Sequence, residues 1–317
     1  MGVRKGPVED LIDRAGGCAV IDGGFATQLE LEGADITDPL WSAVCLISDP
    51  DLIRRVHLQY LEAGADIIVT SSYQVRSLGY HPGVSVEGLS IEAGERLLQR
   101  SVQLALEARD RFWKAHLRAP RRSYHRALVA ASVGSYGAYL ADGSEYSGRY
   151  GPDVGLEKLK DFHRRRLQIF VGAGPDMLAF ETIPNKIEAQ ALVELLDEEQ
   201  IQIPSLICFS SVDGEHVCSG ESFADCLEIV NKSEKVAAVG LNCHTDKLIA
   251  VYPNSGEIWD GRAKKWLPSE CYGDEKFTAL AKRWRECGAS LVGGCCRTTP
   301  STIRSLSAAL KSGPPLS

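Results

Sequence analysis

Two adjacent cysteines near the C-terminus, Cys295 and Cys296, are the side chains in this sequence best suited to chemistry. They follow a pair of glycines at the end of an apolar run, and a Thr-Pro helix start comes directly after them. Adjacent cysteines do not easily bond to each other, so we expect them to bind a soft metal ion, which needs at least one more protein ligand. Cys243 also ends an apolar run and can supply that ligand. Three thiolates from two strand ends predict a zinc site with an open fourth position.

Two other uses of these cysteines are open at this point. His244 could complete a closed structural zinc site in a binding protein, or the Cys295–Cys296 pair could be a redox centre. A structural site has four protein ligands, so Cys243→Ser would unfold a structural zinc protein but would leave an enzyme folded and inactive. Retention of zinc in the absence of oxidant would argue against the redox use.

Two carboxylates follow other apolar runs. Glu181 would lie at the edge of a mostly apolar region, either as a structural partner for an arginine or a backbone amide, or as an anchor for a substrate ammonium group. Asp22 has the same two interpretations. Gly23 and Gly24 after it allow a ligand to approach the backbone, whose N–H groups can donate to a carboxylate. An ammonium anchor beside such donors suits an amino acid.

The chain that must position these residues repeats one unit. Gly64, Gly174 and Gly288 each follow a helical pattern and precede an apolar run, which is typical of a glycine that ends a helix before a strand. Apolar runs with little alternation predict strands covered on both faces. The eight predicted strands lie near residues 18–21, 66–71, 127–133, 176–182, 204–210, 236–242, 248–252 and 290–295. The predicted helices span Pro50–Ala63, Val86–His116, Leu156–Ala173, Lys186–Glu198, Phe223–Asn231, Glu275–Cys287 and Ser301–Leu310.

Alternating strands and helices over this length predict a single domain, residues 1–317, folded as a (β/α)8 barrel of the TIM type. An open doubly wound sheet is the alternative, but Asp22–Ala26 lacks the G-x-G-x-x-G spacing of a dinucleotide-binding turn. A barrel carries its active site at the carboxyl ends of its strands, and the candidate residues all lie at or directly after the ends of predicted strands. Two longer loops, 136–155 and 254–273, reach the same rim. They are either ordinary barrel loops or covers whose aromatic rings face a cation.

Composition limits the class of protein. Because 44% of its residues are hydrophobic, the chain can bury a large core. Its net charge of -7 indicates that it does not bind nucleic acid, since phosphate binding depends on clustered Lys and Arg. The basic run His163–Arg166 lies within a predicted helix and indicates a solvated face. No apolar stretch reaches the roughly 18 residues needed to span a membrane, and no signal peptide is recognisable, which predicts a cytoplasmic protein. Most of the ten cysteines are then expected to be buried hydrophobic residues.

Three motifs carry a resemblance to a known family: Asp22-Gly23-Gly24, Asn242-Cys243 and Gly293-Gly294-Cys295-Cys296-Arg297-Thr298-Thr299-Pro300. They resemble those of the zinc-dependent homocysteine S-methyltransferases. The last two together are specific, whereas the first alone is weak. The wider match covers nearly the whole chain and is similar to the branch that uses S-methylmethionine, especially its plant members. It includes Thr70-Ser71-Ser72-Tyr73-Gln74, Gly134-Ser135-Tyr136-Gly137-Ala138, Phe180-Glu181-Thr182 and Tyr252-Pro253-Asn254-Ser255-Gly256.

The resemblance implies that Cys243, Cys295 and Cys296 hold zinc (Zn2+) and that L-homocysteine enters the open position through its sulfur. Zinc would deprotonate that thiol at neutral pH, and three thiolates would keep it electron-rich enough to attack a methyl group. The expected donor is S-methylmethionine, with S-adenosylmethionine as a second candidate. Betaine or another sulfonium compound is the alternative. A methylfolate- and cobalamin-dependent enzyme is not expected, because no cobalamin module fits in this length.

The same resemblance assigns the carboxylates. Glu181 would bind the ammonium group of homocysteine, while Asp22 and the backbone of Gly23 and Gly24 would help to hold the amino acid. The enzyme's main contribution would then be the alignment of the attacking sulfur, the methyl group and the leaving sulfur. The motifs carry no prediction of oligomeric state.

One segment departs from the family pattern. Between Cys243 and Ile249 only residues 244–248 are available, whereas a parallel crossover needs a dozen or more residues and normally a helix. Relatives carry a helix here. We therefore expect this chain to lack that helix, strand seven to be displaced, shortened or irregular, and the protein to be less stable and less active than a form that retains the helix. A poorly active variant with a structural zinc site is accordingly a further alternative.

Overall fold

The computed structural model describes residues 5–36, 44–73, 75, 90–118, 124–140, 142–211, 213–240, 248–255, 257–260, 265–267 and 273–311. Cys243, His244 and Tyr272 lie outside these ranges. None of the helices within them is long and apolar enough to cross a membrane.

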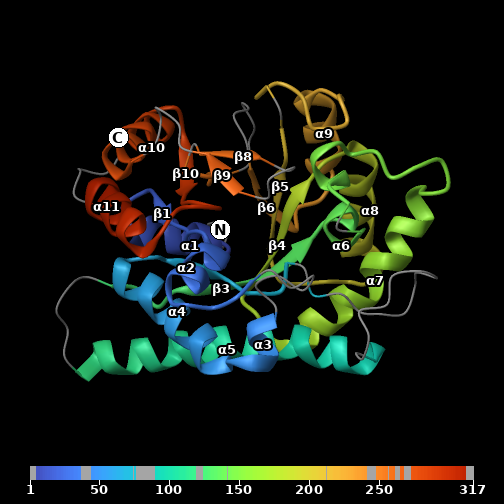
Figure 1. The fold of residues 1–317 in the computed structure, drawn as a ribbon. Coiled ribbons are helices and arrows are strands. Elements are labelled where there is room, and N and C mark those ends of the chain that lie inside the picture. Colours follow the sequence, from blue (N-terminus) through green and yellow to red (C-terminus); the bar gives the residue numbers. More distant parts are fainter. Residues whose placement is uncertain are drawn as a thin grey trace.

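Eight parallel strands form a barrel (Figure 1). They follow one another around it in the order β1-β10-β7-β6-β5-β4-β3-β2, and every neighbouring pair is parallel. The two ends of this order meet, because Ile21 bridges Ile67 and the Asp66 amide donates to the Val20 carbonyl at 2.7 Å. This closure confirms the predicted (β/α)8 barrel and excludes the open sheet. The strands are β1 (Ala19–Val20), β2 (Ile67–Val69), β3 (Leu128–Gly134), β4 (Met177–Ile183), β5 (Ser205–Phe209), β6 (Val236–Gly240), β7 (Leu248–Val251) and β10 (Ala289–Val292).

Helices surround the barrel on its outer side (Figure 1). Three of them, α4, α7 and α8, have the predicted bounds, whereas α5 begins at Ile91 and not at the predicted Val86, because Ser90 caps it by accepting a hydrogen bond from the Ala93 amide. The main helices are α4 (Pro50–Ala63), α5 (Ile91–Arg118), α7 (Leu156–Ala173), α8 (Lys186–Glu198), α9 (Phe223–Val230), α10 (Asp274–Glu286) and α11 (Pro300–Lys311). Elements that the sequence did not predict are α1 (Pro7–Arg14), α2 (Phe25–Leu31), α3 (Cys45–Ser48), α6 (Tyr136–Leu140), the 3-10 turn η2 (Ser144–Tyr146) and the antiparallel pair β8 (Ile258–Asp260) and β9 (Lys265–Leu267).

Local signals explain the helix ends. The Asp49 side chain accepts a hydrogen bond from the Leu52 amide at the start of α4, where Pro50 supplies a preset backbone angle. Gly64 ends the same helix with a left-handed φ of 105°, which favours glycine. Asn185 caps α8 and Ser222 caps α9 in the same way.

In two of the repeated units, an aspartate at the amino end of a strand accepts a hydrogen bond from the backbone of the neighbouring strand. Asp66 Oδ2 accepts from the Val20 amide of β1 at 2.9 Å, and Asp176 Oδ2 accepts from the Val129 amide of β3 at 2.7 Å. Lys311 of the last helix also donates to Asp66, at 2.8 Å. These buried bonds fix the order of the strands at the amino end of the barrel.

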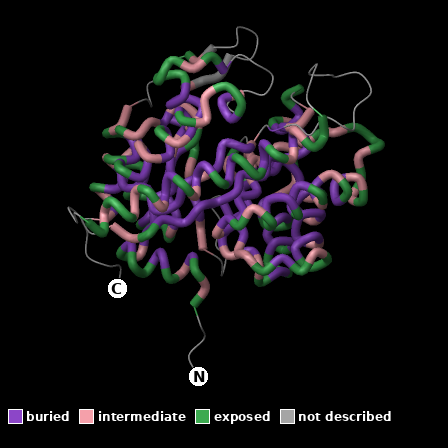
Figure 2. Tube along the Cα trace, turned by 90° about the horizontal axis from the view of Figure 1, so that it is seen from below, coloured by how far each residue is buried: buried purple, intermediate pink, exposed green. Residues whose placement is uncertain are grey.

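The hydrophobic core has two parts that follow from strand alternation. Residues that point outward pack under the helix ring, while Ile67, Leu128 and Met177 point inward and fill the barrel. Helix α1 closes the amino end, because its Val8 and Leu11 are fully buried among these inward residues. Figure 2 shows the buried stretches through the middle of the molecule and the exposed ones around its outside. The carboxyl end is thereby left as the open end.

Strands β6 and β7 are joined by residues 241–247, all of which lie outside the described ranges. β7 pairs only with the last part of β6, in regular register from Ala238↔Leu248 to Gly240↔Ala250. β7 begins opposite Ala238, the third residue of β6. After β6 ends, the chain therefore has to run back along only part of the length of that strand before β7 starts. Strand seven is therefore shortened at its start, as predicted, while the expected irregularity is absent from its pairing with β6. It is present on the other side, where the pairing with β10 shifts between Ala289 and Leu291.

The basic run at 163–166 only partly forms the predicted solvated face. Arg164 and Arg165 form ion pairs with glutamates of neighbouring helices. His163 and Arg166 are 0% and 4% exposed, because they point from α7 toward α8 and the loop that follows β3. Arg164 and Arg165 thus lie at the surface, whereas His163 and Arg166 belong to the interior.

Candidate active site at the carboxyl end of the barrel

The segment with the paired cysteines is held between the ends of two strands. The Gly294 amide donates to the Asp22 carbonyl at 3.0 Å, and the Cys295 amide donates to the Pro253 carbonyl at 2.9 Å. Asp22 follows β1, and Pro253 follows β7. Cys295 and Cys296 therefore lie at the carboxyl end of β10, on the rim where the sequence predicts the chemistry.

Glycines are required here because the backbones lie very close. A Cβ added at Gly24 would lie 2.5 Å from the Cys295 carbonyl oxygen, and one at Gly294 would lie 2.3 Å from the Thr298 side chain. Thr298 is fully buried, and its hydroxyl donates to the Cys295 carbonyl at 2.7 Å. Tyr60 donates from beneath to the Gly24 carbonyl at 3.1 Å. The position of Cys295 is thus set by Thr298 and Tyr60, which sequence reasoning missed as site residues because their contacts are distant in sequence.

The two thiols are close enough to bind one ion. Their Sγ atoms lie 4.0 Å apart, and the hydrogen bond between them raises the pKa of Cys295 and lowers the pKa of Cys296. A bound cation would favour the thiolate form of both side chains. Two thiolates on one tetrahedral zinc ion are about 3.8 Å apart, since each Zn–S bond is about 2.3 Å. The donor set fits zinc. The described residues contain no group of three possible metal ligands, and Cys243 is not among them.

Glu181 points into the mouth of the barrel. It lies on the same side of β4 as Met177 and Ala179, which fill the barrel interior, and Thr182 after it has a left-handed φ of 57°. Burial raises the pKa of Glu181 to about 8, and the negative charge of Cys295 adds to the rise. No ion pair to Glu181 occurs within the described part of the chain, so the structural arginine partner weighed for it is not found there.

Asp22 is only 3% exposed, and its Oδ2 atom accepts from the Val69 amide at 2.9 Å. Burial raises its pKa well above the ordinary value despite that bond, and the charge of Glu181 adds to the effect. Of the two glycine amides predicted to cradle a carboxylate, the Gly24 amide already donates to Thr298, at 3.0 Å to both the hydroxyl and the carbonyl oxygen. A substrate carboxylate at this end would therefore have to find other donors than Gly24. Two carboxyl groups and two thiols in one apolar mouth form a site that attracts cations.

Two tyrosines also lie at this rim. Tyr146, on η2 in the loop after β3, is 63% exposed. Tyr252 follows β7, and its buried hydroxyl lies beside the Cys208 thiol. Tyr252 is a site residue that the sequence indicated only as part of a motif. From the other predicted rim loop, Trp259 pairs with Trp266 between β8 and β9.

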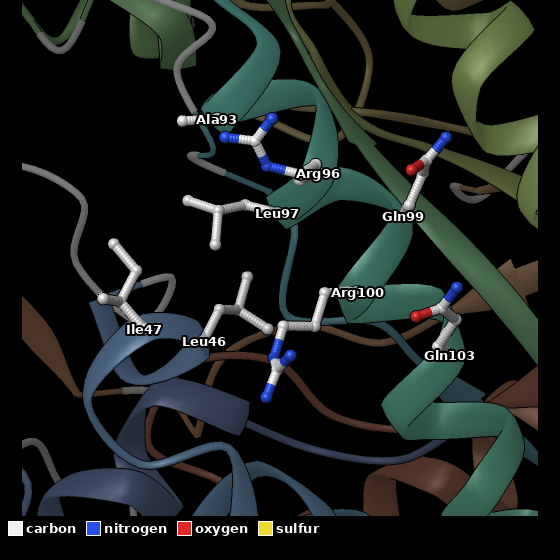
Figure 3. A pocket seen from close by; sticks show the side chains of 8 residues that line it. All are labelled: Leu46, Ile47, Ala93, Arg96, Leu97, Gln99, Arg100 and Gln103. Carbon is white, nitrogen blue, oxygen red and sulfur yellow. The ribbon is translucent and has the colours of Figure 1, made fainter. Parts of the chain in front are cut away.

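Of two surface grooves, one lies beside this mouth and the other lies away from it. One of about 490 Å³ borders Arg297 and Ser255, beside the cysteine segment. The other, of about 590 Å³, lies on the helix ring between α3 and α5 (Figure 3) and has no lining residue from a strand end. It is therefore separate from the candidate site. Its lining residues are Leu46, Ile47, Ala93, Arg96, Leu97, Gln99, Arg100 and Gln103.

The family of the chain follows from its whole sequence. Residues 19–310 match the family described as Homocysteine S-methyltransferase. The chain belongs to this family. The matched range runs from the first strand of the barrel to its last helix, and it contains the cysteine pair, Asp22 and Glu181.

Similar members of the homocysteine S-methyltransferase family come from plants and bacteria. Homocysteine S-methyltransferase 1 from Zea mays is 66% identical, with 96% of this chain and 98% of the relative covered. Homocysteine S-methyltransferase 1 from Arabidopsis thaliana is 64% identical, with 96% and 97% covered. The solved structure of the homocysteine methyltransferase MmuM from Escherichia coli, metallated form, has a TM-score of 0.80 and 36% identity, covering 95% of this chain and 99% of that chain.

The alignment with the maize relative extends over 321 positions, which is more than the 317 residues of this chain. The relative therefore has residues with no counterpart here.

Proposed function

We propose that this chain transfers a methyl group from S-methylmethionine to the thiolate sulfur of L-homocysteine, with zinc as its cofactor. The observation that carries the proposal is the Cys295–Cys296 thiol pair, with Sγ atoms 4.0 Å apart, in the same barrel mouth as Glu181 and Asp22. This set offers soft ligands for a metal and carboxylates for an amino acid's ammonium group. Family membership supports the homocysteine acceptor.

The proposed zinc ligands are Cys295, Cys296 and Cys243. A zinc ion bound there would lower the pKa of the homocysteine thiol and hold its sulfur. The two described ligands are placed by backbone contacts, since Cys295 is fixed through its amide, its carbonyl and the glycines around it. Such fixed placement is what a catalytic site needs.

The carboxylates would bind charge rather than move protons. The thiolate sulfur forms a bond to the methyl carbon while the bond from that carbon to the sulfonium sulfur breaks, and its electron pair stays on the leaving sulfur. A negative thiolate and a positive sulfonium thus become two neutral thioethers, so no proton has to be transferred. Glu181 would accept the homocysteine ammonium group, whose charge favours the ionised form of a carboxyl with a pKa of about 8. Asp22, which follows β1, would add a second carboxyl group to the barrel mouth.

The proposal is tested by metal analysis combined with a donor panel. The purified chain should hold about one zinc ion, and both Cys295→Ser and Cys296→Ser should abolish its binding. S-methylmethionine, S-adenosylmethionine and betaine should then be compared as donors at equal concentration. Full zinc retention by both variants would overturn the zinc site, and a clear preference for betaine would overturn the donor assignment.

We also propose a cytoplasmic location. Its support is that the described cysteines, including the buried Cys18, Cys45, Cys208 and Cys226, are all free thiols, as is usual in a reducing compartment. A fluorescent fusion found in a secretory compartment would contradict it.

A further inference from the structure

A buried carboxylate outside the active site, that of Glu188, joins three parts of the chain. It is fully buried at the third residue of α8 and accepts hydrogen bonds from the Tyr136 amide at 2.6 Å, the Tyr150 hydroxyl at 2.5 Å and His163 Nε2 at 2.8 Å. Loss of the carboxylate would leave these donors unpaired in the interior, which is unfavourable. Glu188 therefore holds Tyr136, Tyr150 and His163 in fixed positions relative to α8.

Two of these partners bracket the first part of the loop after β3. Tyr136 and Tyr150 enclose the first part of this loop, which continues to Gly155 before α7, and their rings pack edge to face with centroids 5.3 Å apart. The middle of the loop is also held, because Asn185 Nδ2 donates to the Gly148 carbonyl at 3.1 Å and Ser210 Oγ donates to the Glu145 carbonyl at 3.1 Å. This part of the loop is thus attached at both ends to one carboxylate and in its middle to the ends of β4 and β5.

The residue that this loop presents to the rim is Tyr146. Its neighbour Glu145 is bonded to Ser210 after β5, and Gly148 is bonded to Asn185 after β4, so Tyr146 lies over the carboxyl ends of these two strands. At the same time 63% of the residue is exposed, so part of it is free to contact a ligand. An exposed aromatic face at this rim is suited to a cation.

We propose that Glu188 is a positioning residue for the methyl donor, because it fixes the loop 142–151 so that Tyr146 forms one wall of the donor subsite. This inference rests on the proposed transfer from a sulfonium donor. A sulfonium group carries positive charge next to the methyl group that is transferred, and the face of a tyrosine ring stabilises such a cation without forming a bond to it. Homocysteine is bound by other groups, so the loop acts on the donor alone.

Three variants test the anchoring of the loop by Glu188 separately from the aromatic ring of Tyr146. Tyr150→Phe removes one hydrogen bond to Glu188 and keeps the aromatic packing, Glu188→Gln changes the carboxylate, and Tyr146→Leu removes the ring at the rim. Each should raise the KM for S-methylmethionine roughly tenfold while zinc content and the homocysteine Kd stay unchanged. Tyr124→Phe is the matched control, because the Tyr124 hydroxyl bonds the Glu62 carbonyl far from the site, and its KM should not change.

Hydrogen exchange provides the second measurement. In Tyr150→Phe and Glu188→Gln, but not in Tyr146→Leu, the amides of residues 142–151 should exchange faster without any ligand. The inference is overturned if the donor KM stays unchanged in both anchor variants, or if the homocysteine Kd rises as much as the donor KM. Failure of the proposed function looks different, since the unaltered chain itself would then transfer no methyl group, and the donor role of the loop would fall with it.

Discussion

Glu181 is a carboxyl group held in an apolar mouth without a described cation beside it. If it binds the homocysteine ammonium, Glu181→Gln should weaken homocysteine binding by roughly tenfold to a hundredfold, because a hydrogen bond to a charged group contributes about 1.5–3 kcal/mol. Zinc content should not change. Calorimetric titration of the zinc-loaded variant with homocysteine measures this effect. Glu95→Gln is the control, since Glu95 pairs with Arg165 on the outer helices. An unchanged affinity would remove Glu181 from the site.

His57 predicts a pH dependence of stability. It is fully buried against Phe25, with ring centroids 4.6 Å apart, and neither ring nitrogen has a partner among the described residues. Burial lowers its pKa to about 3. Between pH 6.5 and pH 3 the unfolded imidazole therefore binds a proton that the folded one does not, so stability is lost as the pH falls, by up to about 1.4 kcal/mol per pH unit.

His57→Phe should remove this contribution. The free energy of unfolding of the variant should fall less than that of the original chain between pH 7 and pH 5, as measured by urea unfolding at both pH values. His125→Phe, on a partly exposed residue, is the control. Equal slopes in the original chain and His57→Phe would show that His57 is not neutral in the folded state.

At the scale of elements, the close approach of the turns after β1 and β10 positions the thiols. A Cβ at Gly24 would push against the Cys295 carbonyl oxygen at 2.5 Å, which is backbone and cannot rotate away. Gly24→Ala should therefore displace Cys295 and lower zinc affinity by tenfold or more, an effect of about 1.4 kcal/mol. A competition titration with a chelator measures it.

Gly172→Ala in α7 is the matched control for that substitution. Nothing lies within 4 Å of the added Cβ, so the change should leave zinc affinity unaltered and stabilise the helix by about 0.5–1 kcal/mol. Zinc affinity that is equal in Gly24→Ala and Gly172→Ala would show that the glycine contact does not position Cys295.

Elements were predictable from the sequence where local chemistry decides them. The bounds of α4 and α8 follow from Asp49, Gly64 and Asn185, which act within a few residues of the helix ends. Helix α1 was missed although local signals for it are present, since Pro7 begins it, acidic residues occupy its first turn, and Val8, Leu11 and Ile12 lie on one face. The short turns α6 and η2 are fixed from outside, α6 by Glu188, which accepts from the Tyr136 amide, and η2 by Ser210, which donates to the Glu145 carbonyl.

Some residues of the candidate site were likewise predictable from the sequence, and others were not. Cys295, Glu181 and Asp22 were predictable because the carboxyl ends of barrel strands meet at one rim, and the structure places all three there. Thr298 and Tyr60 were not, since their role is to contact backbone atoms distant in the sequence. The use of the Gly24 amide by Thr298 was hidden for the same reason.

At the scale of the whole molecule, the barrel closes although one crossover is short. Only residues 241–247 join β6 to β7, and Ile249 and Val251 of β7 are partly exposed. Apolar surface that a crossover helix would cover contributes about 25 cal/mol per Å2 when it is buried. Insertion of a helix-containing crossover between Gly240 and Leu248 should therefore raise the melting temperature by several degrees and increase turnover. The same insert placed in the exposed turn at Gly214 is the control. Equal melting and equal turnover with and without the helix would show that the short crossover costs nothing.

The central claim is the chemistry of the rim, and it is tested most directly by following carbon-labelled L-homocysteine in the zinc-loaded chain with unlabelled S-methylmethionine. We predict one labelled and one unlabelled methionine per turnover, and no labelled methionine with Cys296→Ser. A folded, zinc-loaded chain that forms no labelled methionine, or that forms it equally well as Cys296→Ser, would contradict the account.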